Sequence, residues 1–335
     1  MNVLAPSELP AAPRIAVIRL SAMGDLVFAL PAVKALRDSF PDATIDWIVE
    51  DKHAGLLRSC PFINNLVIFP RSSLRPLTLL KHLSQLRRRP QYDYIFDFQS
   101  NLKSALQLIA LKSKHKVGFA RPTAKEGSSL FHNQHVQVAP RLHRAQRDFE
   151  FLRRAFPSLQ QPSAVRWPLK VEVDGADLTL LHTTTSNHGR DKDWGKENWI
   201  ELAKRLKTYG HKVALLHTPG DRDHVQKIAI ASGVNLAPET PSLEHLMALC
   251  DTARLLVSTD SGPAHITALR GQKVVCLYGP TDPLIYAPPG SAGVKVIDGC
   301  SESDVRPPRE RSKQSPLMKK ISVDAVVDAV TKLQL

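Results

Sequence analysis

The chain has 335 residues, which predicts about two domains, and its 43% hydrophobic and 23% charged residues are typical of a soluble globular protein rather than a disordered one. No apolar run approaches the ~20 residues that a helix needs to cross a bilayer, so no membrane-spanning segment is predicted. The net charge of +13 is concentrated, because residues 52–147 hold seventeen Lys or Arg against three acidic residues; this favours a docking face for an anionic partner over a merely solvated surface.

The first residues and the cysteines indicate where the protein works. The opening MNVLAPSELPAAP has neither the basic nor the apolar region of a signal peptide. The four cysteines are far apart and form no Cys-x-x-Cys pair (Cys60, Cys250, Cys276 and Cys300). We therefore expect reduced thiols, no zinc site and a cytoplasmic protein.

Apolar, β-branched runs alternate with helical patterns along the chain. In the first half, strands are predicted at residues 14–20, 44–50, 65–70, 94–98 and 116–120, with helical stretches such as 30–40 and 73–89 between them. In the second half, strands are predicted at 178–182, 212–217, 254–258 and 273–279, separated by helices at 198–210, 223–233 and 242–250. This alternation predicts an α/β protein with parallel sheets covered on both faces.

The domain boundaries follow from a Pro-rich, weakly patterned stretch near the middle of the chain. We expect one doubly wound domain at residues 1–160, a linker at 161–177 and a second doubly wound domain at 178–335. The polar, basic stretch 301–320 is expected to be a mobile loop. The stretch 321–335 is expected to form an amphipathic helix, which could return to pack on the first domain.

The turn in RLSAMGDLVFALPAV, residues 19–33, joins the first strand to its helix. It lacks the G-x-G-x-x-G pattern of a dinucleotide site, and its carboxylate, Asp25, would repel a phosphate. An N-cap would explain this residue, but the small neighbours Ser21 and Ala22 leave it open, and the helix N-terminus favours its ionised form. Asp25 is therefore a candidate general base.

The segment STDSGPAHITALRG, residues 258–271, carries the best candidate phosphate site. Asp260 or Ser261 can cap the following helix, and Gly262 lets the backbone approach a ligand, where amides and the helix dipole suit a phosphate. A well-capped helix with a satisfied histidine is the alternative. Capping does not explain His265 one turn further on, so ligand binding is favoured.

Two other strand ends carry polar groups. Three threonines, residues 183–185, end one strand, and Lys192 in the loop that follows can place a point charge on a phosphate, although loop lysines are often only solvated. Asp221 and Asp223 form a D-x-D that could bind a metal. Arg222 stands between them and both acids fall in a first helical turn, so a hydrogen bond from Asp221 to a ribose is favoured instead.

Together these segments resemble the bacterial heptosyltransferases of glycosyltransferase family nine. The resemblance rests on RLSAMGDLVFALPAV, FDFQSNLKSAL, LHTTT…DKDW and STDSGPAHITALRGQKVVCLYGPTDP, and it spans about residues 14 to 285. It implies the GT-B fold, two Rossmann-like domains with parallel sheets facing across a cleft. The acceptor would bind the N-terminal domain and the nucleotide sugar the C-terminal one. YGPTDP and FQSNLKSAL are most similar to heptosyltransferase I.

The resemblance also implies the reaction. Family members of this kind transfer heptose from ADP-L-glycero-D-manno-heptose onto the Kdo region of the lipopolysaccharide inner core, with inversion, without a cofactor and without a metal. The basic first half would then meet the anionic acceptor, Kdo-lipid A, and the protein would lie peripherally on the cytoplasmic face of the inner membrane. Heptosyltransferase II or a later core-extending enzyme is the alternative, and a nucleotide-sugar epimerase of the same fold is less favoured. A nucleic-acid-binding protein lacks a supporting motif, and a dehydrogenase lacks the glycine fingerprint.

Matching positions give an expected role to each site residue. Asp25 would deprotonate the acceptor, and Lys192 would neutralise the leaving diphosphate. Pro241, in a turn expected to flank adenine, stands where some relatives carry methionine. The expected nucleotide-sugar site comprises Thr183, Thr184, Asp221, Pro241, Asp260, Ser261, Gly262 and His265. The expected acceptor site comprises Ser21, Gly24, Arg58, Arg71, Lys103 and Arg121.

Overall fold

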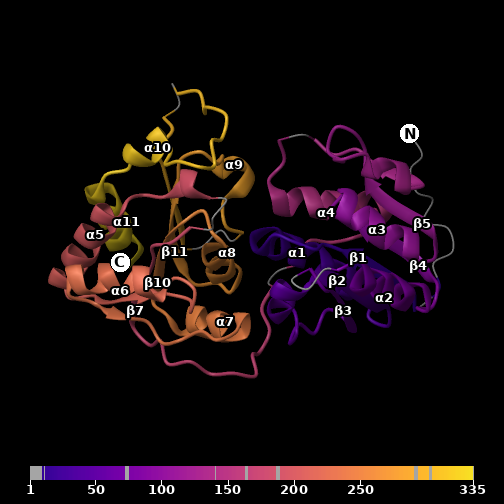
Figure 1. Cartoon of the computed structure of the whole chain (residues 1–335), viewed down its shortest axis with the longest axis horizontal. Coiled ribbons are helices and arrows are strands. Elements are labelled where there is room, and N and C mark those ends of the chain that lie inside the picture. The colour runs from indigo at the N-terminus through magenta and orange to yellow at the C-terminus, as the bar shows by residue number, and fades with distance from the viewer. Residues whose placement is uncertain are drawn as a thin grey trace. The chain divides into compact units, whose positions relative to one another are not determined.

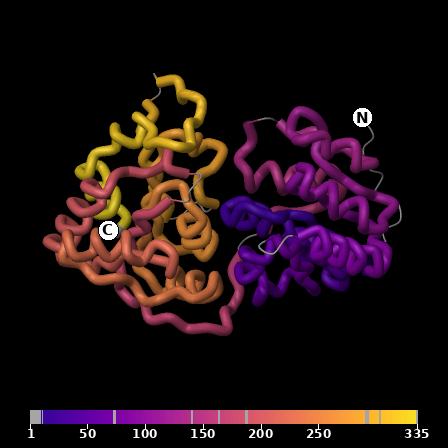
Figure 2. Tube along the Cα trace, viewed as in Figure 1, coloured from indigo at the N-terminus to yellow at the C-terminus, as the bar shows by residue number. Residues whose placement is uncertain are grey.

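The computed structural model divides the chain into two compact units, Met1–Trp167 and Pro168–Leu335, each continuous in sequence. In Figures 1 and 2 the indigo-to-magenta part of the chain forms the first unit, and the orange-to-yellow part belongs to the second. The division falls inside the stretch 161–177 that the sequence marks as a linker. The structure describes residues 10, 12–71, 75–139, 141–162, 165–185, 189–289, 293–301 and 304–334.

The first unit is built on a six-stranded parallel sheet of order β3-β2-β1-β4-β5-β6. Its strands are β1 (Arg14–Ile18), β2 (Thr44–Glu50), β3 (Asn65–Phe69), β4 (Tyr92–Asp97), β5 (Ser113–Phe119) and β6 (Gln134–Val136). The run Ile15–Ile18 of β1 is fully buried, because helices cover both faces of the sheet. The chain order reverses beside β1, so the end of β1 lies at the switch point where ligands bind in sheets of this kind.

Helices pack on the first sheet in two pairs. Their bounds are α1 (Met23–Ser39), α2 (Pro76–Arg87), α3 (Leu102–Ala110) and α4 (Arg144–Ala155), with short 3-10 helices η1 (Asp51–Leu56) and η2 (Ser128–Phe131). Helix α1 packs against α4, and α2 packs against α3. Leu86 of α2 and Leu108 of α3 join the core formed with Ile18 and Ile48 of the sheet.

The second unit repeats this plan with a parallel sheet of order β12-β11-β10-β7-β8-β9. Its strands are β7 (Leu178–His182), β8 (Lys212–Leu216), β9 (Asn235–Leu236), β10 (Leu255–Thr259), β11 (Lys273–Tyr278) and β12 (Val294–Asp298). The chain order reverses between β7 and β10. The ends of these two strands therefore form the switch point of this sheet.

Helices also cover both faces of the second sheet, as Figure 1 shows for α5, α6 and α11 on one side and α7, α8 and α9 on the other. Their bounds are η3 (Arg190–Lys192), α5 (Lys196–Thr208), α6 (Arg222–Ser232), α7 (Leu243–Thr252), α8 (Gly262–Leu269), α9 (Pro283–Tyr286), α10 (Pro316–Lys319) and α11 (Val323–Gln334). Helix α11 packs against α5 and the sheet, and its Val326 and Val330 lie in the core of this unit. The apolar face of the last helix is thus used within the second unit.

The predicted α/β class with two doubly wound parallel sheets is confirmed. Three strands were not predicted from the sequence: β6, β9 and β12. They are short or lie at sheet edges, and their residues are mostly only partly buried, so they lack the continuous apolar run that marks a central strand.

Contrary to the expectation of a loop at 301–320, the described part of this stretch contains helix α10 and contacts residues that are distant in sequence. Arg309 makes a two-pronged ion pair with Asp191, at 2.7 and 3.0 Å, and Asp191 is 1% exposed. Further along, Leu317 and Met318 are buried. The ion pair of Arg309 with Asp191 attaches the segment to η3, and the polar composition of the segment gives no sign of this contact.

Two sequence expectations about covalent and membrane chemistry can be checked on the described residues. Cys60, Cys250 and Cys276 are buried, Cys300 is partly buried, and none of the four forms a disulfide. Within the described ranges, no helix combines the length and apolarity needed to cross a bilayer.

Candidate functional site

The turn after β1 presents Asp25 in the first turn of α1. The carboxylate is one third exposed, and its Oδ2 lies 3.4 Å from the backbone nitrogen of Ala22, which precedes the helix. Its Oδ1 lies 2.9 Å from Nη2 of Arg19, which is 4% exposed. Asp25 is therefore a fixed, ion-paired carboxylate with one side open to solvent.

Arg19 is itself held by three groups. Its Nη1 donates to the carbonyl oxygen of Phe98, and its Nη2 lies 4.0 Å from Oδ2 of the fully buried Asp148. Asp148 in turn accepts two hydrogen bonds on Oδ1 from Arg147, at 2.9 and 2.6 Å. The guanidinium of Arg19 therefore lies between the carboxyl groups of Asp25 and Asp148, and it fixes the side chain of Asp25.

The stretch FQSNLKSAL connects this turn to β4. Gln99 Oε1 accepts hydrogen bonds from the backbone nitrogens of Leu20 and Ser21, at 3.1 and 3.2 Å. Asp97, which is fully buried, accepts from Ser104 Oγ at 2.7 Å and lies 2.9 Å from His132 Nε2. These contacts fix the position of the opening turn relative to the end of β4.

The six predicted acceptor residues lie in segments of the chain that leave the carboxyl edge of the first sheet. They follow the carboxyl ends of five neighbouring strands: Ser21 and Gly24 after β1, Arg58 after β2, Arg71 after β3, Lys103 after β4 and Arg121 after β5. The three arginines are exposed. Lys103 Nζ lies 3.1 Å from Oε1 of the buried Glu50, so its charge is partly compensated. Asp25 lies on the same edge.

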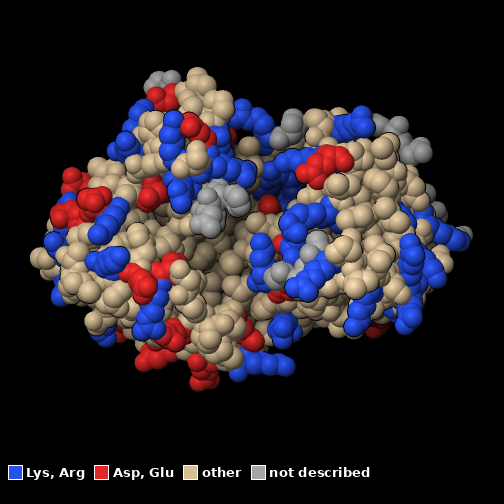
Figure 3. Space-filling view, viewed as in Figure 1, with Lys and Arg blue, Asp and Glu red and all other residues tan. Residues whose placement is uncertain are grey.

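The excess of positive charge that the sequence shows in residues 52–147 lies within the first unit. That unit contains 24 Lys and Arg against 12 Asp and Glu, a net charge of +12, whereas the second unit has a net charge of +1. On the face drawn in Figure 3, basic side chains prevail over the first unit and both signs mix over the second.

In the second unit, Lys192 and Asp260 form an ion pair at the switch point. Lys192 Nζ lies 2.7 Å from Asp260 Oδ2 and donates to the Asp260 carbonyl oxygen at 3.0 Å. His265 Nε2 lies 3.0 Å from Asp260 Oδ1. Burial opposes ionisation of Asp260, but the charge of Lys192 and the contact with His265 outweigh it, and the pKa falls well below its usual value. Lys192 thus faces the site as a cation already paired with a carboxylate.

Helix α8 begins immediately after this pair. Ser261 is its N-cap residue, but contrary to expectation its hydroxyl makes no capping hydrogen bond and lies 2.7 Å from Ser258 Oγ. It also lies 3.2 Å from Nδ1 of His182, whose Nε2 is 3.4 Å from Thr184 Oγ1. Burial lowers the pKa of His182 to about 4, so the imidazole is neutral at pH 7. Its two ring nitrogens orient the hydroxyls of Ser261 and Thr184. The amides at the start of α8, next to Gly262, are not capped by the Ser261 side chain.

A cavity of about 470 Å³ lies at the carboxyl ends of β7 and β8, and the residues that line it do not include Lys192, Asp260, Ser261, Gly262 or His265. Thr183, Thr184 and Asp221 line it, as predicted for a nucleotide-sugar site. Asp221 accepts from Thr184 Oγ1 at 2.8 Å and from the backbone and hydroxyl of Thr218 at 2.6 and 2.8 Å. Burial alone would raise the pKa of Asp221, but these hydrogen bonds lower it by more. Asp221 is therefore ionised and can accept hydrogen bonds from a ligand. Pro241 is exposed just before α7, and the structure does not place it in this cavity.

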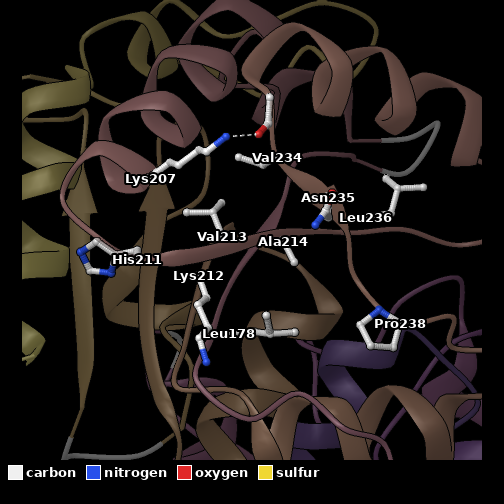
Figure 4. A pocket seen from close by; sticks show the side chains of 11 residues that line it. Leu178, Lys207, His211, Lys212, Val213, Ala214, Val234, Asn235, Leu236 and Pro238 are labelled. Carbon is white, nitrogen blue, oxygen red and sulfur yellow. Dashed lines mark hydrogen bonds between the residues drawn. The ribbon is translucent and has the colours of Figure 1, made fainter.

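A larger cavity, about 550 Å³, lies elsewhere (Figure 4). Leu178 and Lys212, the first residues of β7 and β8, line it, so it adjoins the amino ends of these strands. None of the predicted site residues borders it. Ligands of parallel α/β sheets bind at the carboxyl ends, so the smaller cavity is the candidate site.

Sequence reasoning missed several residues of these sites. Arg19 and Gln99 support Asp25, and His182 supports the hydroxyls around α8. The one feature of the sequence that points to them is a polar residue at the end of an apolar run, such as Arg19 in RIAVIRL and His182 in LTLLH. In the parts of the chain that the structure describes, no group of three or more His, Cys, Asp or Glu side chains is arranged to hold a metal ion.

Comparison with known proteins identifies the family of the chain. A model of glycosyltransferase family 9 (heptosyltransferase) matches residues 79–319. The chain is 27% identical to the lipopolysaccharide core heptosyltransferase OpsX of Haemophilus influenzae, over 96% of this chain and 97% of that protein. It is 28% identical to lipopolysaccharide heptosyltransferase 1 of Escherichia coli K12, over 81% of this chain and 89% of that protein.

Solved structures share the fold. Escherichia coli heptosyltransferase WaaC with ADP matches with a TM-score of 0.77 and 22% identity, over 96% of this chain and 99% of that one. Escherichia coli ADP-heptose lipopolysaccharide heptosyltransferase II matches with a TM-score of 0.74 and 22% identity, over 96% and 98%. The family model covers well over half of the chain, and the two units have the GT-B fold of these enzymes. The chain therefore belongs to glycosyltransferase family 9 and is a glycosyltransferase.

Proposed function

We propose that the protein is an inverting, metal-independent heptosyltransferase of lipopolysaccharide core synthesis. Its donor would be ADP-L-glycero-D-manno-heptose and its acceptor the Kdo region of the inner core, as Kdo-lipid A. The observation that carries the proposal is Asp25, a partly exposed carboxylate fixed by Arg19 at the switch point of the basic unit. The relatives named lipopolysaccharide heptosyltransferase 1 support the choice of donor and acceptor.

The donor half of the proposal rests on the second unit. Asp221 would accept hydrogen bonds from the ribose, with Thr183 and Thr184 beside it in the cavity. The diphosphate would lie at the start of α8, where the amides near Ser261 and Gly262 suit an anion. Asp260 and His265 would shape the sugar-phosphate pocket, and Pro241 would lie near the adenine.

The acceptor half rests on the charge of the first unit. Kdo-lipid A carries carboxylates and phosphates, which match the net charge of +12. Arg58, Arg71 and Arg121 are exposed and lie in segments that leave the sheet edge carrying Asp25, and we assign them to these anions. The same charge would hold the protein peripherally on the anionic cytoplasmic face of the inner membrane.

The reaction would be a single displacement. Asp25 accepts the proton of the acceptor hydroxyl while that oxygen forms a bond to the anomeric carbon of heptose. The bond from this carbon to the phosphate oxygen breaks on the opposite face, which inverts the configuration, and ADP leaves with the electron pair. Lys192 and the α8 amides would stabilise the charge that develops on the diphosphate. These groups supply the electrostatic role that a metal ion plays in other transferases, which is why we propose a metal-independent reaction.

A transfer assay tests the proposal directly. The purified protein would be incubated with ADP-heptose and either Kdo-lipid A or its mono-heptosylated form, in EDTA. We expect heptose transfer to Kdo-lipid A and an inverted anomeric centre in the product. Transfer only to the mono-heptosylated acceptor would assign the protein to heptosyltransferase II instead. Loss of activity in EDTA, restored by a divalent cation, would contradict the metal-independent mechanism.

A further inference from the structure

The stretch of residues 304–315, here called the basic segment, is held against the second unit by specific contacts. It carries four cations against two acids, and it forms part of the yellow loop next to α10 in Figure 1. Besides the ion pair of Arg309 with Asp191, the backbone nitrogen of Ser315 donates to the Asp191 carbonyl at 3.1 Å. Gln314 Nε2 donates to the Asp193 carbonyl at 3.0 Å. The basic segment is therefore bound to η3 and the residue after it, and η3 carries Lys192.

This attachment makes the basic segment one wall of the cavity at the carboxyl end of β7. Ser312, Lys313 and Gln314 line that cavity together with the threonines and Asp221. Arg190, the first residue of η3, lines it as well. Two cations from separate elements, Arg190 and Lys313, thus border the cavity. The sequence motifs do not predict that either of them binds the donor.

The cavity also contains a polar group that has no partner. Thr183 is 5% exposed, and its Oγ1 makes no hydrogen bond with any residue that the structure describes. A buried hydroxyl without a partner is unfavourable, so a ligand oxygen at this place would satisfy it. Hydroxyls, the two cations and two carboxylates, Asp193 and Asp221, line the cavity. This mixture suits an oxygen-rich ligand that places its anionic part against Arg190 and Lys313 and its hydroxyls against Asp221.

We propose that the basic segment is part of the nucleotide-sugar site, with Lys313 and Arg190 binding the diphosphate and Arg309 positioning the segment through Asp191. This inference rests on the proposed function, because the ligand is its ADP-linked donor. Lys313 is now paired with Glu310 at 2.8 Å, and both side chains are largely exposed. A diphosphate, with a higher charge than one carboxylate, replaces Glu310 as the partner of Lys313 when the donor binds.

Arg309 also contributes through its location. The hydrogen bonds to Asp191 raise the pKa of Arg309, and the negative charge of Asp260 adds to this effect. Asp191, the partner of Arg309, directly precedes Lys192, so the ion pair holds Arg309 next to the residue that is proposed to meet the leaving diphosphate. The ion pair of Arg309 with the buried Asp191 fixes the distance between the basic segment and the Lys192–Asp260 pair.

Calorimetric titration with ADP, AMP and adenosine tests this inference without relying on turnover. We expect Lys313→Gln to weaken ADP binding about tenfold, as for a lost charge-assisted hydrogen bond, and to change adenosine binding less than twofold. Arg309→Gln should weaken ADP binding similarly, and Arg309→Lys should restore part of the affinity because it keeps the charge but not the two-pronged pair. Lys319→Gln, an exposed lysine on α10 outside the cavity, is the matched control and should bind ADP like the wild type.

The outcomes separate this inference from the proposed function. If the wild type binds ADP while Lys313→Gln and Arg309→Gln bind it with unchanged affinity, the basic segment has no role in donor binding and the proposed function stands. If the variants weaken adenosine as much as ADP, contact with the diphosphate is refuted. If the wild type binds neither ADP nor ADP-heptose, the proposed function fails and this inference fails with it. Circular dichroism of each variant checks that the fold is kept.

Discussion

Protonation of His182 should destabilise the second unit in a defined pH range. This side chain ends β7 and contacts Ser258, Ser261 and Thr184, with its Nδ1 3.0 Å from Ser258 Oγ. Burial lowers its pKa from 6.5 to about 4, against a smaller opposing effect of Asp221. The unfolded chain therefore takes up this proton before the folded protein does as the pH falls.

The size of the effect follows from this difference in pKa. The stability that His182 contributes is complete above about pH 6.5 and is lost progressively as the pH falls to 4. A gap of about 2.5 pKa units at about 1.4 kcal/mol per unit corresponds to roughly 3 kcal/mol. The same reasoning holds for His53 in the first unit, where burial and then the charge of Lys52 lower the pKa to about 4.

Hydrogen exchange of peptides from β7 and β10, corrected for intrinsic rates, measures the stability of the second unit at pH 7, 5.5 and 4. Between pH 7 and 4, the wild type should lose about 3 kcal/mol more than His182→Asn, which cannot be protonated. The other titratable groups of the unit are present in both proteins, so the difference reports His182 together with its coupling to Asp221. His224→Asn, at an exposed position of α6, should behave like the wild type. Equal losses in the wild type and His182→Asn would refute a buried neutral imidazole.

Three further variants test packing and charge. Gly299→Ala would place its Cβ 2.0 Å from the Leu317 carbonyl oxygen and should lower the stability of the second unit by about 1–3 kcal/mol in urea unfolding. Gly220→Ala would place its Cβ 4.0 Å from Thr218 Oγ1, an ordinary contact, and should change the stability by less than ~0.5 kcal/mol. Lys192→Gln should reduce kcat by roughly 100-fold, and an unchanged kcat in a folded variant would remove this lysine from the mechanism. It should also destabilise the second unit by roughly 3 kcal/mol, measured by the same unfolding, because it removes the cation paired with the buried Asp260 and leaves this carboxylate with its contact to His265.

The sequence indicated the parts of the fold that are encoded locally. The central strands are continuous apolar runs, such as Ile15–Ile18, and their buried environment follows directly from that pattern. The turn with Asp25 and the start of α8 at Gly262 were recognisable because motif residues adjoin a strand end and a helix start. Edge strands such as β9 have only two residues, which no periodicity can reveal.

The supporting residues of the site depend on contacts between distant parts of the chain. Arg19 meets Phe98 across 79 residues, and Arg309 meets Asp191 across 118. No local pattern predicts such pairs, because their partners come together only when the strands are assembled. The basic segment therefore resembled a solvated loop in sequence, although in the structure it borders the candidate donor cavity.

The most direct test of the account is the turnover of Asp25→Asn with ADP-heptose and Kdo-lipid A. Asp38→Asn, which removes an exposed carboxylate of the same helix that pairs with Lys34, is the matched control. If Asp25 is the general base, kcat of Asp25→Asn should fall by 10²–10⁴-fold, while its affinity for ADP stays within about twofold of the wild type and Asp38→Asn remains active. Near-normal turnover by a correctly folded Asp25→Asn would contradict the proposed mechanism.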